Sequence, residues 1–321
     1  MTALAIIAAL FAAGAVVTVI GARVIDRTRL PRGRFLDIDG FRQHVVELGA
    51  SPEMKGAPPV ILLHGAGANL EDMALALGEH LAVRHRVILL DRPGFGFSAR
   101  KIREGGSPAY QASILRRVLD RLGIDRPVLV GHSWGGTLAL TFALDYPQRV
   151  AGLVLVAPPT HPHLQHLTKL HQWLITPVGR FFAHTLAMPF GLVLMDLGIR
   201  NAFLPQKPPR KYIERSAMRL VLRPATLIAN WTDIAGLETF LAQQAERYGE
   251  LSASTIVLAG DRDTLVPTPL HATLLAAAAP GVKLKVLPGF GHMLHHDAAD
   301  RVAAAVAEIV DGAGLRTERG E

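Results

Sequence analysis

The feature that most constrains the fold is the run VLVGHSWGG at residues 128–136. An apolar, β-branched stretch stops at a glycine, a serine follows two residues later, and two more glycines come soon after. A serine held at a strained corner with positive φ brings the residues two before and two after it close together, so only glycine fits at positions 131 and 135. The run therefore predicts a strand, a sharp turn that exposes the Ser133 hydroxyl, and a helix.

The sequence around this run supports the same order of elements. Residues 128–130 have the pattern of a buried strand, and residues 137–146 have that of a helix ended by Pro147. A plainer alternative is a serine in an ordinary loop, where it caps the following helix. The order of strand, Gly-x-Ser-x-Gly and helix instead favours a nucleophilic serine.

Short apolar runs alternate with helical patterns along most of the chain. Asp39-Gly40 is a strong hairpin signal between the first two runs. Strands that are apolar along their whole length indicate an α/β fold whose mostly parallel sheet is covered by helices on both faces. We expect strands at residues 35–38, 41–48, 60–63, 86–90, 128–130, 150–156, 255–258 and 284–287, and helices at 70–81, 109–122, 137–146, 270–279 and 298–310.

The alternation breaks at residues 158–248, where no strand pattern is found and prolines, histidines and aromatic residues accumulate. Helices are expected there at 164–174 and 211–222. Such an insertion most simply forms a helical cap over the carboxyl ends of the strands, where parallel sheets bind ligands. The alternative is a separate structural domain away from the site. Residues 35–157 and 249–311 then form the core, and residues 312–321 a frayed tail.

Composition excludes several classes of protein. Half of the 321 residues are apolar and 19% are charged, so the chain is neither disordered nor fibrous. The absence of cysteine excludes disulfides, a cysteine nucleophile and thiolate metal sites. The net charge is +7, but no basic run interleaves with aromatic residues, so no nucleic-acid partner is expected. No histidine pair has H-E-x-x-H spacing, so neither a metal nor another cofactor is predicted.

The first 23 residues predict a membrane anchor. Residues 3–22 carry no charged side chain, and about 20 residues suffice for a helix to cross a bilayer. A cleaved signal peptide is the alternative, but it requires a positively charged start, which is missing here. Residues 24–34 form a basic juxtamembrane segment that would attract anionic headgroups. The arginines after the span predict a single-pass anchor with a cytoplasmic globular part; they are Arg23, Arg27, Arg29, Arg32 and Arg34.

A nucleophilic serine needs a base within hydrogen-bonding reach. His292 is the best candidate because it ends the run PGFGH just after the last predicted strand, on a loop that two glycines allow to approach other backbone closely. His295 and His296 follow closely and remain alternatives.

The base in turn needs a carboxylate to orient it. The run GDRDTLVP at residues 260–267 follows another predicted strand and offers Asp261 and Asp263. Asp261 is better suited to capping a turn, so Asp263 is the predicted acid. The resulting order of serine, acid and histidine is that of hydrolases with a Gly-x-Ser-x-Gly turn.

Two backbone N–H groups are expected to form the oxyanion hole. The strand at 60–63 runs into a loop of small residues, and this loop places the N–H of Ala66 near that of Trp134. Each such donor stabilises a developing oxyanion by roughly 3–4 kcal/mol. A plain glycine turn is the alternative for this loop.

Together these segments resemble the α/β-hydrolase superfamily over residues 35–310. His64-Gly65 resembles its oxyanion motif, DRPGFGFS at 91–98 resembles the loop after its next strand, and the serine run matches its nucleophile elbow. Epoxide hydrolases and haloalkane dehalogenases of this family carry an aspartate at the elbow, whereas this chain has Ser133. Their chemistries are therefore not expected.

The resemblance implies a membrane-anchored serine hydrolase that cleaves a lipophilic carboxylic ester through an acyl-enzyme. Ser133 would attack, His292 would transfer the proton, and Asp263 would orient the imidazole. The cap aromatics Trp173, Phe181 and Phe182 are expected either to line the substrate pocket or to pack the cap onto the sheet. Two alternatives remain: C–C bond hydrolysis of a diketone-like substrate, and a non-catalytic scaffold with the hydrolase fold.

Overall fold

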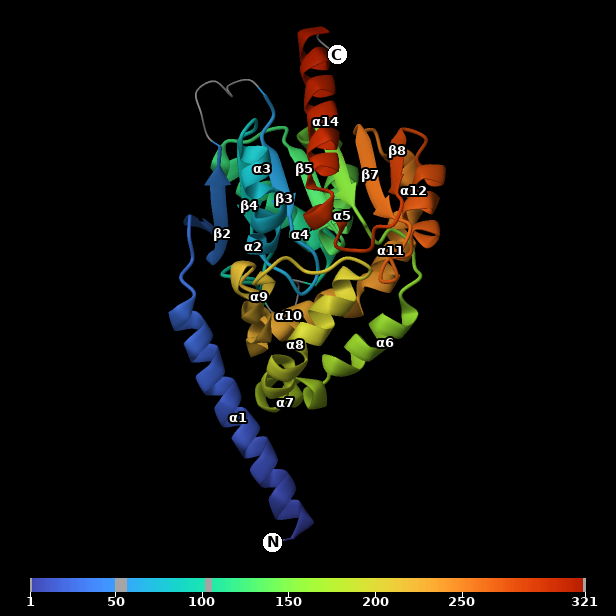
Figure 1. Ribbon diagram of the computed structural model, residues 1–321. Coiled ribbons are helices and arrows are strands. Elements are labelled where there is room, and N and C mark those ends of the chain that lie inside the picture. The colour runs from blue at the N-terminus through green and yellow to red at the C-terminus, as the bar shows by residue number, and fades with distance from the viewer. Residues whose placement is uncertain (1, 50–56, 102–105, 320–321) are drawn as a thin grey trace.

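The computed structural model describes residues 2–49, 57–101 and 106–319. Its centre is an eight-stranded sheet in the order β1-β2-β4-β3-β5-β6-β7-β8, in which β2 pairs antiparallel with both of its neighbours and all other pairs are parallel (Figure 1). The predicted hairpin and the mostly parallel sheet are both present. The strands are β1 (Arg34–Ile38), β2 (Phe41–Leu48), β3 (Val60–Leu63), β4 (Val87–Leu90), β5 (Val128–His132), β6 (Gly152–Val156), β7 (Thr255–Gly260) and β8 (Val282–Leu287).

Helices cover both faces of the sheet, which explains why the central strands are apolar at every position. In β3, Ile61 and Leu63 belong to the core under α4 (Pro108–Leu122), α5 (Trp134–Asp145) and α12 (Ala272–Ala278). The alternate residues Val60 and Leu62 pack on the opposite side. That side is covered by α2 (Leu70–Met73), α3 (Glu79–Ala82), α13 (Leu294–Asp297) and α14 (Ala299–Arg319).

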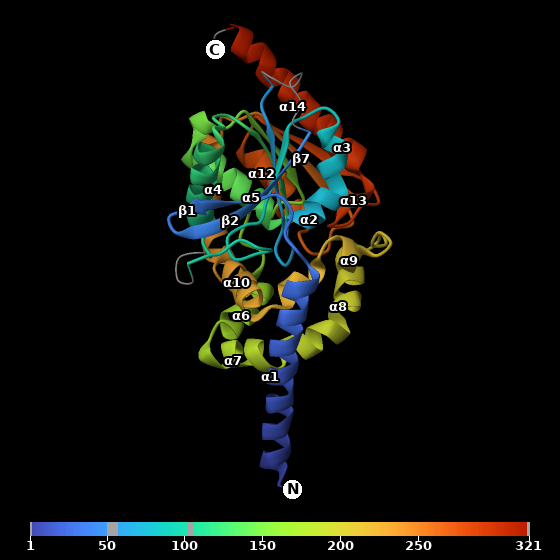
Figure 2. The same cartoon turned by 90° about the vertical axis from the view of Figure 1, so that its left-hand side faces the viewer.

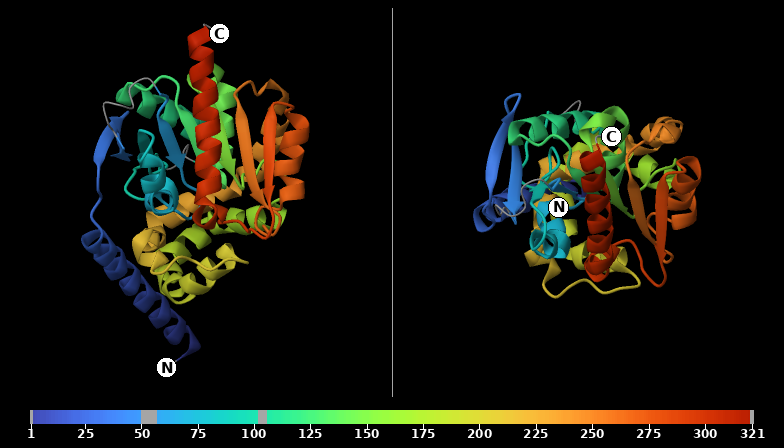
Figure 3. Two further views of the ribbon diagram at one scale, coloured as in Figure 1. Left: turned by 45° about the horizontal axis from the view of Figure 1, so that its top comes forward. Right: turned by 90° about the horizontal axis from the view of Figure 1, so that it is seen from above.

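Two predicted segments differ from the structure by more than small shifts of their ends. The helix expected at 70–81 is interrupted by a π-helical turn at Ala74–Gly78, between α2 and α3. The expected frayed tail from residue 312 is instead the continuation of α14, which runs to Arg319 and projects beyond the sheet (Figure 3). Residues 320 and 321 lie outside the described part of the chain.

The insertion forms a layer of helices below the carboxyl ends of the parallel strands (Figure 1). The sequence pattern predicts α6 and the region of α9, but it misses the other four helices, whose glycines, prolines and mixed polarity obscure their period. The cap helices are α6 (Gln165–Leu174), α7 (Pro177–Thr185), α8 (Ala187–Phe203), α9 (Tyr212–Arg215), α10 (Pro224–Ala235) and α11 (Leu237–Ala245).

The N-terminal helix α1 (Ala3–Thr28) lies against the cap and not against the sheet (Figures 1 and 2). It is long and apolar enough to cross a membrane. It extends past residue 23, so part of the predicted juxtamembrane segment is helical. Thr18 donates a hydrogen bond from Oγ1 to the carbonyl of Thr185 at 2.8 Å, which links α1 to the end of α7.

Candidate active site

Ser133 occupies the turn between β5 and α5 with φ 50° and ψ −124°. The strained backbone explains the flanking glycines. A Cβ on Gly131 would lie 2.3 Å from the carbonyl oxygen of Gly135, and a Cβ on Gly135 would lie 2.3 Å from that of Leu63. The backbone N–H of Ser133 donates to Val156 of β6 at 2.8 Å, so the turn is fixed to the sheet.

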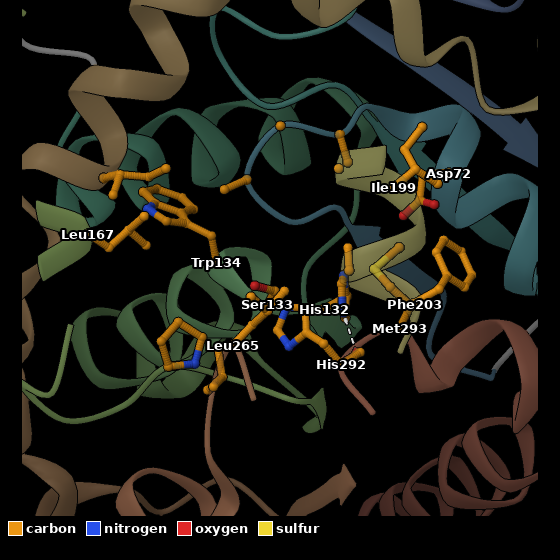
Figure 4. Close-up of a pocket in the computed structure, with 18 of the residues that line it drawn as sticks. Asp72, His132, Ser133, Trp134, Leu167, Ile199, Phe203, Leu265, His292 and Met293 are labelled. Atoms are coloured by element: carbon orange, nitrogen blue, oxygen red, sulfur yellow. Dashed lines mark hydrogen bonds between the residues drawn. The ribbon is translucent and has the colours of Figure 1, made fainter. Parts of the chain in front are cut away.

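His292 and Asp263 meet at the same edge of the sheet, from the loops after β8 and β7. The Nδ1 atom of His292 lies 2.8 Å from Oδ2 of Asp263, and both side chains are almost fully buried. The other carboxylate oxygen accepts the backbone N–H groups of Leu265 and Val266 at 2.9 and 2.8 Å. This arrangement keeps the proton on Nδ1 and leaves Nε2 of His292 to accept a proton. Figure 4 shows the imidazole beside Ser133.

The residues that the sequence offered as alternatives for the acid and the base have other partners. Asp261 is exposed and accepts the backbone N–H of Gly289 at 2.6 Å, which is the turn-capping role expected of it. His295 and His296 both bind Asp72. Among the candidates named from sequence, the geometry thus brings Ser133, Asp263 and His292 together.

The proposed oxyanion donors lie on the same cavity wall. Ala66 and Trp134 line the cavity together with Ser133. Trp134 is the first residue of α5, where backbone N–H groups have no acceptor within the helix. The loop that carries Ala66 is held by Arg92, whose guanidinium donates to the carbonyls of His64 and Gly65 at 3.0 and 3.1 Å.

His64 is a structural residue in this arrangement. Its Nε2 atom accepts the backbone N–H of Arg92 at 3.0 Å, and its Nδ1–H donates to the carbonyl of Gly65 at 2.8 Å. Complete burial lowers the pKa of His64 to about 3, so the ring is neutral at physiological pH. Arg92 belongs to the run DRPGFGFS, but the sequence does not reveal its role, because its ion-pair partner Asp233 is 141 residues away.

The cavity at Ser133 has a volume of about 370 Å³ and extends to both sides of the serine. Leu167 and Trp134 lie on one side of the hydroxyl, and Ile199, Phe203 and Asp72 lie on the other (Figure 4). Most of the lining is apolar. None of the described residues that line it is a lysine or an arginine.

A match to a known protein family identifies the family of this chain. The family model of the alpha/beta hydrolase fold matches residues 58–299, about three quarters of the chain. This chain belongs to the α/β-hydrolase family. The predicted α/β-hydrolase fold, with its mostly parallel sheet, is therefore confirmed.

Known proteins of several activities resemble this α/β-hydrolase. A 2-hydroxy-6-oxo-6-phenylhexa-2,4-dienoate hydrolase from Burkholderia cepacia is 28% identical, over 82% of this chain and 89% of its own. An esterase structure from Thermogutta terrifontis has 22% identity and a TM-score of 0.70, over 88% of this chain and all of its own. The structure of a bacterial membrane phospholipase A has 19% identity and a TM-score of 0.68, over 97% of both chains.

A buried carboxylate, that of Asp72, lies in the wall at one end of the cavity. Asp72 on α2 accepts the hydroxyl of Tyr212 at 2.7 Å, and its oxygens lie 3.3 and 2.9 Å from Nε2 of His295 and His296. Burial alone would raise the pKa of Asp72, but the hydrogen bonds from the two histidines outweigh it and hold that pKa well below its usual value. Asp72 is therefore an anion in the cavity wall.

The same three groups are spaced as metal ligands would be. The ligand atoms of Asp72, His295 and His296 lie within 4.8 Å of one another. In this structure the oxygens of Asp72 accept hydrogen bonds from both histidines. The sequence does not reveal this cluster, because Asp72 is separated from the histidines by more than 220 residues.

His132, the residue before Ser133, contacts the loop that carries the candidate base His292. Its Nε2–H donates to the backbone carbonyl of His292 at 3.1 Å, and its ring centre lies 4.0 Å from that of His295. Burial lowers the pKa of His132 well below its usual value, so the ring is neutral. His132 thus holds the backbone of the candidate base His292.

The three cap aromatics predicted to bind substrate lie elsewhere, which corrects that expectation. Trp173, Phe181 and Phe182 are absent from the cavity lining formed by the described residues. Trp173 and Phe181 are about half exposed, and the Phe181 ring lies 5.1 Å from that of Phe11 on α1. Phe182 packs within the cap beside Trp231. Aromatic content alone does not indicate which face of a cap helix meets the cavity.

Proposed function

We propose that this α/β-hydrolase cleaves neutral, lipophilic carboxylic esters through an acyl-enzyme. Ser133 Oγ attacks the ester carbonyl carbon while Nε2 of His292 takes the hydroxyl proton. The N–H groups of Ala66 and Trp134 stabilise the oxyanion. The tetrahedral intermediate then expels the alcohol, which receives the proton from His292, and a water molecule repeats the sequence to release the acid.

The observation that supports the proposal most directly is the polarity and charge of the cavity lining on either side of Ser133. Its lining is mostly apolar, and its fixed charge is the anion of Asp72, with no lysine or arginine among the described lining residues. A substrate that carries a carboxylate would be repelled by Asp72 and would find no cation to pair with. A neutral ester with apolar groups on both sides fits these walls.

C–C bond hydrolysis is the second candidate. Relatives with 28% identity over most of their length are hydrolases of 2-hydroxy-6-oxo dienoates, and that chemistry occurs on the same fold. Their substrates are anions, as the name dienoate states, and the buried Asp72 carboxylate disfavours them here. We therefore place this activity second.

We further propose that α1 is a single-pass anchor with the hydrolase domain on the cytoplasmic side. The apolar length of α1 and the arginines in its last turns and just after it support this orientation. A cleaved signal peptide is disfavoured because Thr18 is buried and hydrogen-bonded to the cap, and Ile25 belongs to a buried cluster with Met188. Reporter fusions at the carboxyl terminus test the orientation, since a periplasmic signal would reverse it.

Two measurements test the ester proposal. A fluorophosphonate probe should label the membrane-bound protein and should not label Ser133→Ala. Nitrophenyl esters with lengthening acyl chains should be turned over, and a 2-hydroxy-6-oxo dienoate should not. Turnover of the dienoate alone would replace the ester proposal with the second candidate. Equal labelling of the two proteins would show that the nucleophile is wrongly assigned.

A further inference from the structure

The outer surface of the cap carries a group of large apolar side chains, which we name the cap apolar face. Its six members come from α6, α7 and α8, and each is more than half exposed. Large exposed apolar patches are rare on soluble monomers and mark a contact with a protein or a membrane. The cap apolar face consists of Trp173, Val178, Phe181, Phe190, Val193 and Leu197.

This face is continuous with α1. The rings of Phe11 and Phe181 are 5.1 Å apart, which places α7 against the middle of the N-terminal helix. Gly14 faces the backbone of Thr185 so closely that a Cβ would lie 2.8 Å from its carbonyl oxygen. α1 and the cap therefore pack as one body, and their apolar surfaces join.

The depth of these contacts follows from helix geometry. Residues 3–22 rise about 1.5 Å each, so the uncharged part of α1 is about 30 Å long, the thickness of the hydrocarbon core. Phe11, Gly14 and Thr18 lie within that stretch, and all three contact the cap. If α1 spans the bilayer, as proposed above, α7 and the start of α8 lie below the headgroups.

The composition of α7 and α8 agrees with that depth. The two helices, bent by 75° relative to each other, are together long and apolar enough to cross a membrane, as α1 is. Arg180 is the exposed arginine of α7, and its Nε–H donates to the backbone carbonyl of Ile175 at 3.1 Å. On α8, Asp196 and Arg200 form an ion pair at 2.7 Å nearer the core.

We propose that the cap apolar face is immersed in the phospholipid leaflet beside α1, so that the bilayer covers it. This proposal rests on the anchor proposed for α1 and goes beyond it, because an anchor alone would allow the cap to remain in water. In this arrangement one wall of the cavity would also face the lipid. Leu167 lines the cavity and is 44% exposed on α6, the helix that carries Trp173.

The absence of cysteine in the chain allows a clean test by site-directed spin labelling. The full-length protein is reconstituted in vesicles of phosphatidylcholine and phosphatidylglycerol, with one nitroxide at Val193→Cys on the cap, Val16→Cys on α1, or Val83→Cys near α3. All three positions are exposed. Collision with oxygen reports lipid, and collision with a soluble nickel chelate reports water. Fluorophosphonate labelling of each variant verifies the fold.

The expected result is that Val193→Cys loses nickel accessibility on reconstitution to the same extent as Val16→Cys, whereas Val83→Cys keeps it. If Val16→Cys is lipid-exposed and Val193→Cys stays in water, immersion of the cap is overturned and the anchor stands. If both positions stay in water, the anchor fails and the cap proposal fails with it. Val178→Cys, at a second site on the face, must follow Val193→Cys.

Discussion

The carboxylate of Asp233 on α10 accepts a hydrogen bond from Arg92 Nη1 at 2.6 Å, and both side chains are fully buried. Arg92 also holds the carbonyls of His64 and Gly65, and its guanidinium lies 4.0 Å from the centre of the Trp134 ring. Burial lowers the pKa of Arg92 to about 10, so it remains charged at neutral pH. This pair connects the cap to both proposed oxyanion donors.

Removal of Asp233 should therefore destabilise the fold strongly. Asp233→Ala leaves Arg92 and the nearly buried Arg100 without their shared carboxylate. Breaking a buried pair in this way costs about 3–5 kcal/mol, which urea unfolding would measure. As a control, Asp120→Ala removes partly exposed ion pairs with Arg116 and Arg149 and should cost about 1 kcal/mol or less. Equal losses in the two variants would contradict the role of the buried pair.

Asp263 and Asp261 should differ sharply in their effect on turnover. Asp263→Asn keeps the shape of the side chain but presents the wrong tautomer of His292, so kcat on a nitrophenyl ester should fall about 10⁴-fold. Asp261→Asn changes an exposed turn cap and should leave kcat nearly unchanged. Circular dichroism would verify that both variants fold. If Asp261→Asn were the damaging change, the acid would be wrongly assigned.

Gly131→Ala should abolish labelling by the fluorophosphonate probe. The new methyl group would lie 2.3 Å from the carbonyl oxygen of Gly135, and the turn at Ser133 cannot move without leaving the sheet. Gly281→Ala is the matched control, because a Cβ there meets nothing within 4 Å. Normal labelling of Gly131→Ala would show that the turn tolerates a different backbone.

The buried neutral histidines predict a loss of stability in acid. Burial lowers the pKa of His64 to about 3 and those of His271 and His295 to about 4, from 6.5 in an ordinary environment. Between these values the unfolded chain binds more protons, so the free energy of unfolding decreases as the pH falls from 6.5 toward 4. For each histidine, one unit of pKa difference between the folded and the unfolded chain corresponds to about 1.4 kcal/mol in the free energy of unfolding.

Urea unfolding at pH 7 and pH 5 measures this effect. The unfolding midpoint should be clearly lower at pH 5, and His271→Gln should reduce the difference. The same substitution at the exposed His184 should leave the difference unchanged. A midpoint that does not vary between the two pH values would contradict burial of these rings in the neutral form.

Asp72→Asn should relax the selectivity against anionic substrates. An amide can still accept from Tyr212 and His296, so the wall keeps its shape while it loses its charge. The ratio of kcat/KM for an ester with a terminal carboxylate to that for its neutral analogue should rise about tenfold or more, because tenfold corresponds to about 1.4 kcal/mol of removed repulsion. An unchanged ratio would mean that substrates do not approach Asp72.

The central sheet and the positions of Ser133, Asp263 and His292 follow from local sequence. Each of these residues lies within a few residues of the carboxyl end of a strand, and parallel strands bring their carboxyl ends to one edge of the sheet. Glycine at positions 131 and 135 adds a steric requirement that few other turns share. Such signals are contained within a few consecutive residues, so they can be recognised without knowledge of the rest of the fold.

Contacts between the cap and the core could not be predicted in the same way. Arg92 and Asp233 are 141 residues apart, and nothing in either segment indicates the other. The cap helices have apolar residues on more than one side, so sequence does not distinguish a cavity wall from an outer surface. Phe181 illustrates this. The sequence predicted that it lines the substrate pocket, but its ring contacts Phe11 of α1.

The position of Ile25 has a practical consequence for work with this enzyme. Ile25 completes a buried cluster with Met188, Leu220 and Leu222, so α1 supplies part of the interior of the cap. Protein expressed without its first 28 residues would lose this side chain and the hydrogen bond from Thr18 to Thr185. Its substrate chamber would then be bounded by loosened helices, and rates measured on that shortened form would describe a different catalyst from the full-length one.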